Sequence, residues 1–122
     1  MLPEPENTTG SKPANSSEII DIAHLDQYTL GDQGLQKELL QLFRIQLKDQ
    51  VNELMACASE INWKSSCHLL KGASRAVGAW QISQIAEALE EASFEDDANR
   101  AALLSKLLSA KARFEAEVLQ YV

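Results

Sequence analysis

The sequence predicts an all-α fold, an antiparallel four-helix bundle with a short extra helix at its N-terminal end. Three observations favour this fold. All three prolines lie within the first thirteen residues, so no later helix is interrupted by proline. No later segment alternates β-branched and polar residues as a half-buried strand does. Four later segments of similar length carry apolar residues every three or four positions, and short connections between such helices are typical of antiparallel bundles.

The N-terminal segment differs in composition from the rest of the chain. Residues 1–17 combine proline with Glu, Asn, Thr, Ser and Gly. A segment of this kind has too few apolar side chains to form a packed core. We therefore expect residues 1–17 to be a disordered tail or linker and residues 18–122 to form one folded domain.

The first two helices are expected at residues 22–29 and 35–58, separated by Gly31 and Gly34. The longer one shows an apolar spacing of three or four residues, which predicts a helix that buries one face. The apolar residues in this pattern are Leu35, Leu39, Leu42, Phe43, Leu47, Val51, Leu54, Met55 and Ala58.

The remaining helices are expected at residues 61–77, 79–93 and 98–120. Gly78 separates the first two of them, and the acidic stretch EDDAN supplies N-cap residues for the last. The helix at 61–77 has a 4-3-4-3 spacing that predicts a buried seam. Its members are Trp63, Cys67, Leu70, Ser74 and Val77.

The charge and the composition exclude several classes of protein. The chain has 18 Asp and Glu against 11 Lys and Arg, a net charge of −7, which argues against a nucleic-acid partner. It has no apolar run of the roughly 18 residues that a transmembrane helix needs, and its first ten residues lack the basic start and the apolar stretch of a secretory signal. Its two cysteines form no CxxC pair. The cysteines therefore favour a reducing, cytoplasmic compartment. We expect a monomer, because the four helices can bury one another's apolar faces, and we expect neither a membrane partner nor a metal site.

One face of the helix at 61–77 has an unusual set of residues. If the seam is buried, His68 faces outward among Lys64, Ser65, Lys71, Gly72 and Arg75. Residues 61–86 contain no acidic side chain, which suggests a small positive patch. Glycine costs about 1 kcal/mol relative to alanine inside a helix, and close approach of another molecule is the simplest reason to keep it.

Two interpretations of this face follow from the spacing. A neutral imidazole is a competent nucleophile near pH 7, and a lysine one turn away would stabilise a phosphoryl group bound to it. Alternatively, His68 is an ordinary exposed histidine and Gly72 serves helix packing. Neighbouring Cys67 points about 100° away from His68 on a helix, which makes a poor nucleophile–base pair. His24 has no basic neighbour and is expected at the surface.

The stretch HLLKGASRAVGA at residues 68–79 resembles the signature of histidine-containing phosphotransfer (HPt) domains, H-x-L-K-G followed at fixed spacing by an aliphatic residue and G-A. IDIAHLDQYTLGDQGLQKELLQLF resembles the family's first short helix and the start of its second, and LEE at 89–91 resembles the end of its fourth. The resemblance covers roughly residues 18–120.

The resemblance implies roles for individual residues. His68 would be phosphorylated through Nε2, Lys71 would lie near the phosphoryl oxygens, and Gly72 would leave room for the partner. Glu90 stands where chemotaxis-kinase phosphotransfer domains carry a glutamate that accepts a hydrogen bond from Nδ1 of the histidine. Many other members have glutamine there, and an exposed helix acid without a role is the alternative for Glu90. Lys64 and Arg75 stand at positions that vary across the family, so we assign them only to electrostatic steering of the partner. Together with Ser65 they are the expected docking residues.

The resemblance also implies a function. The chain would carry a phosphoryl group between the receiver domains of response regulators, without a kinase activity of its own. A hybrid histidine kinase is a second expected class of partner. It would need no cofactor, because the receiver would supply both the aspartate and the Mg²⁺. Two alternatives remain open: a helical adaptor that is never phosphorylated, or the phosphoacceptor domain of a larger hybrid histidine kinase.

Overall fold

The structure is a computed structural model that describes residues 19–121. In this part of the chain it contains five helices and no strand, which confirms the predicted all-α fold. The prediction for residues 1–17 lies outside the described residues. The helices are α1 (Ile22–Thr29), α2 (Gln33–Ala56), α3 (Glu60–Val77), α4 (Trp80–Glu91) and α5 (Asp97–Val118).

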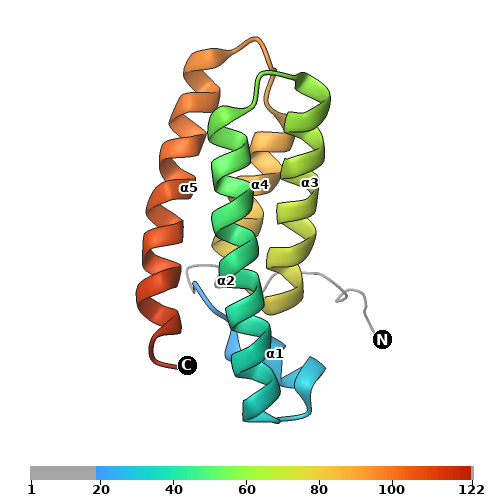
Figure 1. Cartoon of the computed structure of the whole chain (residues 1–122), viewed down its shortest axis with the longest axis vertical. Coiled ribbons are helices and arrows are strands. Elements are labelled where there is room, and N and C mark those ends of the chain that lie inside the picture. Colours follow the sequence, from blue (N-terminus) through green and yellow to red (C-terminus); the bar gives the residue numbers. More distant parts are fainter. Residues whose placement is uncertain (1–18, 122) are drawn as a thin grey trace, which may run out of the picture.

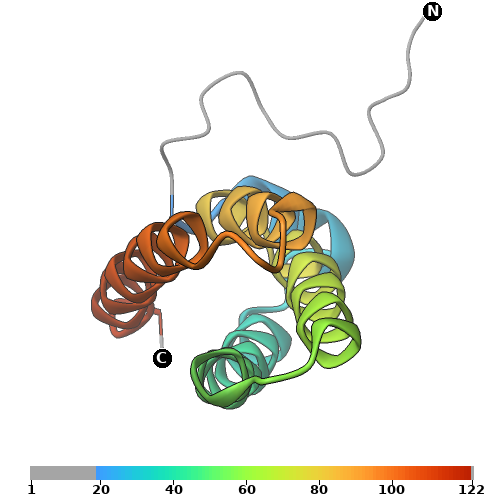
Figure 2. The ribbon, with the colours of Figure 1, turned by 90° about the horizontal axis from the view of Figure 1, so that it is seen from above.

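The four longer helices form an antiparallel bundle (Figure 1). Seen from above, α2, α3, α4 and α5 follow one another around the bundle (Figure 2), and α5 also contacts α2. The short α1 lies at one end of the bundle, against α2 and α3. None of the helices in the described part of the chain combines the length and the apolar character that a membrane crossing requires.

Side-chain caps fix where most of the helices begin. In four helices the side-chain oxygen of the N-cap residue accepts a hydrogen bond from a backbone N–H of the first turn. These N-cap residues are Asp21 for α1, Asp32 for α2, Ser59 for α3 and Asp96 for α5. Because Asp32 caps α2, this helix begins two residues earlier than predicted and includes Gly34. The predicted boundaries of the other helices are correct to within two residues.

The corner between α3 and α4 is held to the start of α1. Gly78 ends α3 with a φ of +78°, a conformation that other residues rarely adopt. Its carbonyl accepts a hydrogen bond from the Asp21 backbone N–H at 3.0 Å, and the Asp21 carboxylate accepts one from Trp80 Nε1 at 2.8 Å. His24 is not the surface residue that we expected: its ring packs edge-on against Trp80 and Tyr28, so it is half-buried.

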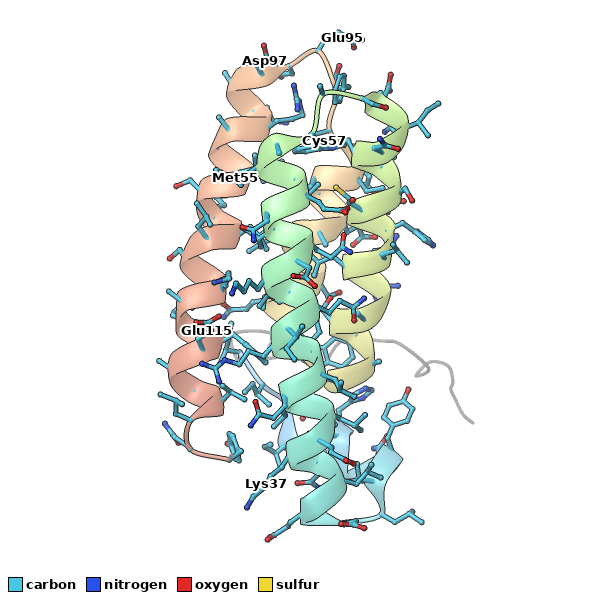
Figure 3. All side chains as sticks on the ribbon, in the orientation of Figure 1. Lys37, Met55, Cys57, Glu95, Asp97 and Glu115 are labelled. Atoms are coloured by element: carbon cyan, nitrogen blue, oxygen red, sulfur yellow. The ribbon has the colours of Figure 1, made fainter. Side chains whose placement is uncertain are left out.

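The core contains the whole seam predicted for α3, because all five of its residues are buried. In α2 the predicted apolar stripe is too wide. Leu35, Leu42 and Met55 are exposed, whereas Leu40, which the predicted pattern omitted, is fully buried (Figure 3 labels Met55). The buried residues of α2 form a narrower row with 3-4 spacing: Gln36, Leu40, Phe43, Leu47, Val51 and Leu54.

Candidate functional site

His68 lies on the outer face of α3, between the two buried residues that anchor the helix at this point, Cys67 and Leu70. Its side chain is 70% exposed. A histidine held by a rigid helix and open to solvent can be reached by another molecule without any local unfolding. This position is the one that the sequence predicted for it.

Glu90 of α4 contacts both His68 and Lys71. One carboxylate oxygen, Oε2, lies 3.2 Å from His68 Nδ1, and the other, Oε1, lies 2.8 Å from Lys71 Nζ. The hydrogen bond from Lys71 is the main reason that the pKa of Glu90 is lowered from its usual 4.5, with a smaller contribution from His68. Glu90 is therefore ionised at neutral pH and is not an exposed helix acid without contacts.

The contact with Glu90 selects one form of the imidazole. A carboxylate can only accept a hydrogen bond, so His68 donates from Nδ1–H. In the neutral ring this leaves the lone pair on Nε2. Within residues 19–121 no hydrogen bond engages Nε2. The ring is thus held by one nitrogen and free to react through the other.

The sequence suggested that segment 61–86 forms a small positive patch, because it contains no acidic residue. In the structure this surface is not free of acidic side chains. Packing of α4 brings Glu87 and Glu90 beside it, and Arg75 lies 4.0 Å from Glu87. Lys64 donates a hydrogen bond to the backbone carbonyl of Glu90 at 2.8 Å. The three cations on α3 therefore all have partners on α4: Lys71 and Arg75 pair with carboxylates, and Lys64 binds a main-chain carbonyl.

A strip of small or apolar side chains runs along the exposed side of α3 beside His68. These residues carry no charge and are all exposed: Ile61, Ser65, Leu69, Gly72 and Ala76. The charged residues of α3 lie on the other flank of the histidine, toward α4. We missed this strip in the sequence, although its spacing of three and four residues was a visible signal. Of the three predicted docking residues, only Ser65 lies on it.

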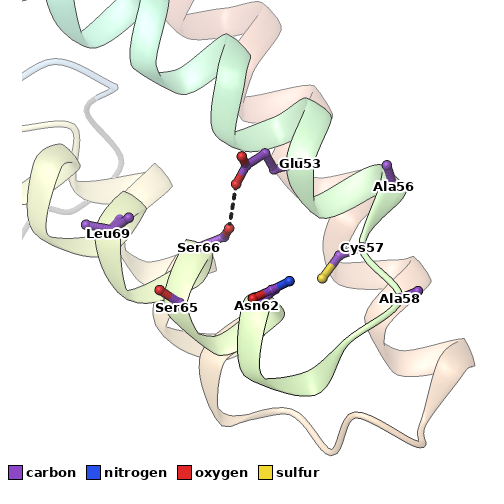
Figure 4. Close-up of a pocket in the computed structure, with 8 residues that line it drawn as sticks. All are labelled: Glu53, Ala56, Cys57, Ala58, Asn62, Ser65, Ser66 and Leu69. Carbon is purple, nitrogen blue, oxygen red and sulfur yellow. Dashed lines mark hydrogen bonds between the residues drawn. The ribbon is translucent and has the colours of Figure 1, made fainter.

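A groove between α2 and α3 borders the strip. Its volume is about 480 Å³, and Ser65 and Leu69 line it from the α3 side (Figure 4). On its α2 side, Glu53 accepts a hydrogen bond from Ser66 at 3.0 Å. The surface next to His68 is therefore hollowed on the α2 side and closed by ion pairs on the α4 side.

Gly72 has no packing role among residues 19–121. A Cβ atom added at this position would meet nothing within 4 Å. The alternative that Gly72 serves helix packing is therefore wrong for the described part of the chain. Its small size instead leaves the surface flat one turn beyond His68.

Other reactive groups near the site do not form a second centre. Cys67 is fully buried, and burial raises the pKa of its thiol from 9.0 to about 12. A thiol in this state is a poor nucleophile. Residues 19–121 contain no cluster of His, Cys, Asp and Glu side chains that could hold a metal ion.

Comparison with known proteins identifies the family. The family model described as "Hpt domain" matches residues 38–114, which is more than half of the chain and includes every predicted site residue. Neither the curated proteins nor the solved structures yielded a match. With a helical bundle and a matching family model, the chain belongs to the Hpt domain family and is a histidine phosphotransfer carrier that works with two-component phosphorelay partners.

Proposed function

We propose that His68 accepts a phosphoryl group from the aspartyl phosphate of one receiver domain and passes it to the aspartate of another. The observation that supports this most directly is the exposed imidazole whose Nδ1 is hydrogen-bonded to Glu90. It combines access for a partner, a fixed tautomer and a free lone pair on Nε2. The neighbouring exposed Gly72 supports the same residue as the site of approach.

The proposed step is an in-line displacement at phosphorus. The lone pair of Nε2 forms the N–P bond while the P–O bond to the receiver's aspartate breaks, and the electron pair of that bond leaves on the aspartate as a carboxylate. The proton stays on Nδ1. Positive charge therefore develops on the ring during the transfer, and the ionised Glu90 at 3.2 Å would stabilise it. The reverse step uses the same contacts.

Lys71 would change partners during the reaction. Before transfer its Nζ forms an ion pair with Glu90 Oε1 at 2.8 Å, and its side chain is only 19% exposed. Since Lys71 lies one turn after His68, a phosphoryl group on Nε2 would bring new anionic oxygens close to it. The ammonium would then be shared between Glu90 and the phosphoryl group, which stabilises the phosphorylated form.

The receiver would dock over the uncharged strip and the adjoining groove, not over a positive patch. The strip is small and partly apolar, and none of residues 19–121 fills the space beside Gly72. Such a surface suits a modest interface that exchanges partners readily. The receiver would bring the aspartate and its Mg²⁺ to His68, and this chain would contribute the imidazole, Glu90 and Lys71.

Phosphotransfer from a purified receiver tests the proposal. Each candidate receiver, phosphorylated on its aspartate, is mixed with the domain and Mg²⁺, and the product is treated with acid and with alkali. We expect phosphate that is labile in acid and stable in alkali, as a phosphoramidate is, and that maps to His68. His68→Gln should accept none, whereas His24→Gln is the matched control for loss of a histidine and should behave as wild type.

The same assay distinguishes the carrier from an adaptor. A receiver that binds the domain tightly but transfers nothing to wild type would support an adaptor and overturn the proposal. Phosphate that persists in His68→Gln would also overturn it, because the acceptor would then be another residue.

A further inference from the structure

We propose that Lys64 is a positioning residue: it holds the last turn of α4, and through it Glu90, against His68. The inference rests on the proposed function of His68. It assigns Lys64 a role different from the electrostatic steering that the sequence predicted, and it arises from the way in which α3 caps the end of α4.

The C-terminal end of α4 is capped only in part by its own backbone. A helix leaves its last carbonyls without intrahelical donors. α4 has no basic residue in its last turn, and its C-cap residue, Ala92, is extended and not left-handed. Ala92 donates its backbone N–H to the carbonyl of Ala88 at 3.0 Å. The next two carbonyls need other donors.

Two consecutive residues of α3 supply these donors. Trp63 Nε1 donates to the carbonyl of Leu89 at 2.9 Å, and Lys64 Nζ donates to the carbonyl of Glu90 at 2.8 Å. The ammonium is also a positive charge at the negative end of the α4 dipole, where a cation is stabilising. The last turn of α4 is therefore tied to the first turns of α3.

Glu90 is thus held by α3 at two points. Lys64 binds its main-chain oxygen, and Lys71 and His68 bind its carboxylate. Lys64 lies one turn before His68 and Lys71 one turn after it, so the two lysines bracket the histidine along α3. A carboxylate on a helix end that was free to fray would lose its fixed distance from Nδ1.

The direction of the Lys64 side chain is what favours positioning over steering. Its ammonium contacts the end of α4, and the residue is partly buried. A steering charge acts through its field in solvent and is screened by salt. The negative end of the α4 dipole offsets part of the Lys64 charge and so reduces its contribution to that field.

Loss of Lys64 should change the state of His68 before any phosphate is present. In Lys64→Met the Glu90 carbonyl loses its donor, and we expect the imidazole to lose its single tautomer. The ¹⁵N shifts of His68 should show one Nδ1–H tautomer in wild type, a mixture in Lys64→Met and recovery in Lys64→Arg. Lys106→Met, on the exposed side of α5, is the matched control and should be unchanged.

The rate of phosphotransfer from a phosphorylated receiver should be lowered by the same variant that mixes the tautomers. At saturating receiver we expect Lys64→Met to slow transfer by about three- to tenfold. This is less than the roughly ten- to hundredfold that loss of a residue holding a metal ligand costs, because Lys64 acts on His68 only through Glu90. The effect should not depend on salt, and Lys64→Arg should restore the rate. In a Glu90→Ala background the Lys64→Met change should have no further effect, because the residue acts through Glu90.

Two results would overturn the inference. One is a wild-type tautomer in Lys64→Met. The other is an effect of Lys64→Met that raises only the receiver concentration needed for half-maximal transfer, weakens with added salt and persists in the Glu90→Ala background. This result would identify Lys64 as a steering charge. If wild type accepts no phosphate, the proposed function of His68 fails, while the ¹⁵N measurement still decides whether Lys64 fixes the imidazole.

Discussion

At the scale of single residues, two glycines close together on the chain have different reasons to be glycine. Gly78 needs its left-handed φ of +78°, and an added Cβ would lie 2.9 Å from the backbone oxygen of Asp21. Gly72 lies inside α3 with no contact that a Cβ would disturb. Among residues 19–121, the contacts therefore require glycine at position 78 but not at position 72.

Alanine substitutions should separate these two glycines by stability. Gly72→Ala should raise the free energy of unfolding by about 1 kcal/mol, because alanine is the better helix former and meets nothing. Gly78→Ala should lower the free energy of unfolding by about 1 kcal/mol or more, because the backbone conformation and the space both exclude a methyl group. Urea unfolding of both variants measures this. Equal effects at the two positions would contradict the distinction.

A larger side chain at Gly72 tests the docking surface. Gly72→Gln should fold as well as wild type but transfer phosphate more slowly, because its side chain would occupy the space that the receiver needs. The transfer rate from a phosphorylated receiver is the measurement, and Gly72→Ala is the control for helix propensity. An unchanged rate in Gly72→Gln would show that the partner approaches His68 from another side.

Glu90 should make the stability of the domain depend on pH. Its pKa is lowered in the folded state, chiefly by Lys71, so its contribution is fully present above the ordinary value of 4.5 and is lost as the pH falls through the lowered pKa. The difference in free energy of unfolding between wild type and Glu90→Gln should be largest above that value and shrink in more acidic solution. A difference that stays constant with pH would contradict the ion pair.

At the scale of the helices, one face of α3 packs into the core and the opposite face bears His68, and the sequence predicted both faces. The seam of α3 is buried as its spacing predicted, so the position of His68 on the opposite side followed directly. α2 was harder to interpret because apolar residues lie on several of its faces. Leu42 and Met55 are exposed although their spacing matched a buried stripe.

The contacts between helices could be predicted only in part. The motif indicated His68, Lys71 and Gly72, and the family resemblance indicated Glu90. The pairing of Arg75 with Glu87 depends on how α4 packs against α3, which local spacing does not specify. The partner of Lys64 is a main-chain carbonyl, and every residue has one, so no sequence pattern could identify it.

The contact between α1 and the α3–α4 corner should contribute to stability but not to transfer. Asp21→Ala removes the N-cap of α1 and the acceptor of Trp80 Nε1, and we expect a loss of roughly 2 kcal/mol. Asp32→Ala removes only the exposed N-cap of α2 and should cost about 1 kcal/mol. Thermal unfolding compares the two variants. A transfer rate that fell in Asp21→Ala at a temperature where it is folded would show that the two ends of the bundle are coupled.

At the scale of the whole molecule, the net charge of −7 says little about the reactive surface. The cations of α3 are paired with α4, and the strip beside His68 carries no charge. The bundle thus presents a reactive imidazole on a nearly neutral surface of an acidic domain. We expect transfer at saturating receiver to vary little with salt, because the proposed interface depends on shape and small side chains.

The measurement that tests the central claim most directly follows a labelled phosphate from one receiver, through this domain, to a second receiver. The two receivers are chosen so that they do not exchange phosphate with each other. With wild type we expect the label to appear first on the domain, bound to His68, and then on the second receiver. With His68→Gln the label should stay on the first receiver. Label that reaches the second receiver through His68→Gln, or that never appears on the wild-type domain, would contradict the account.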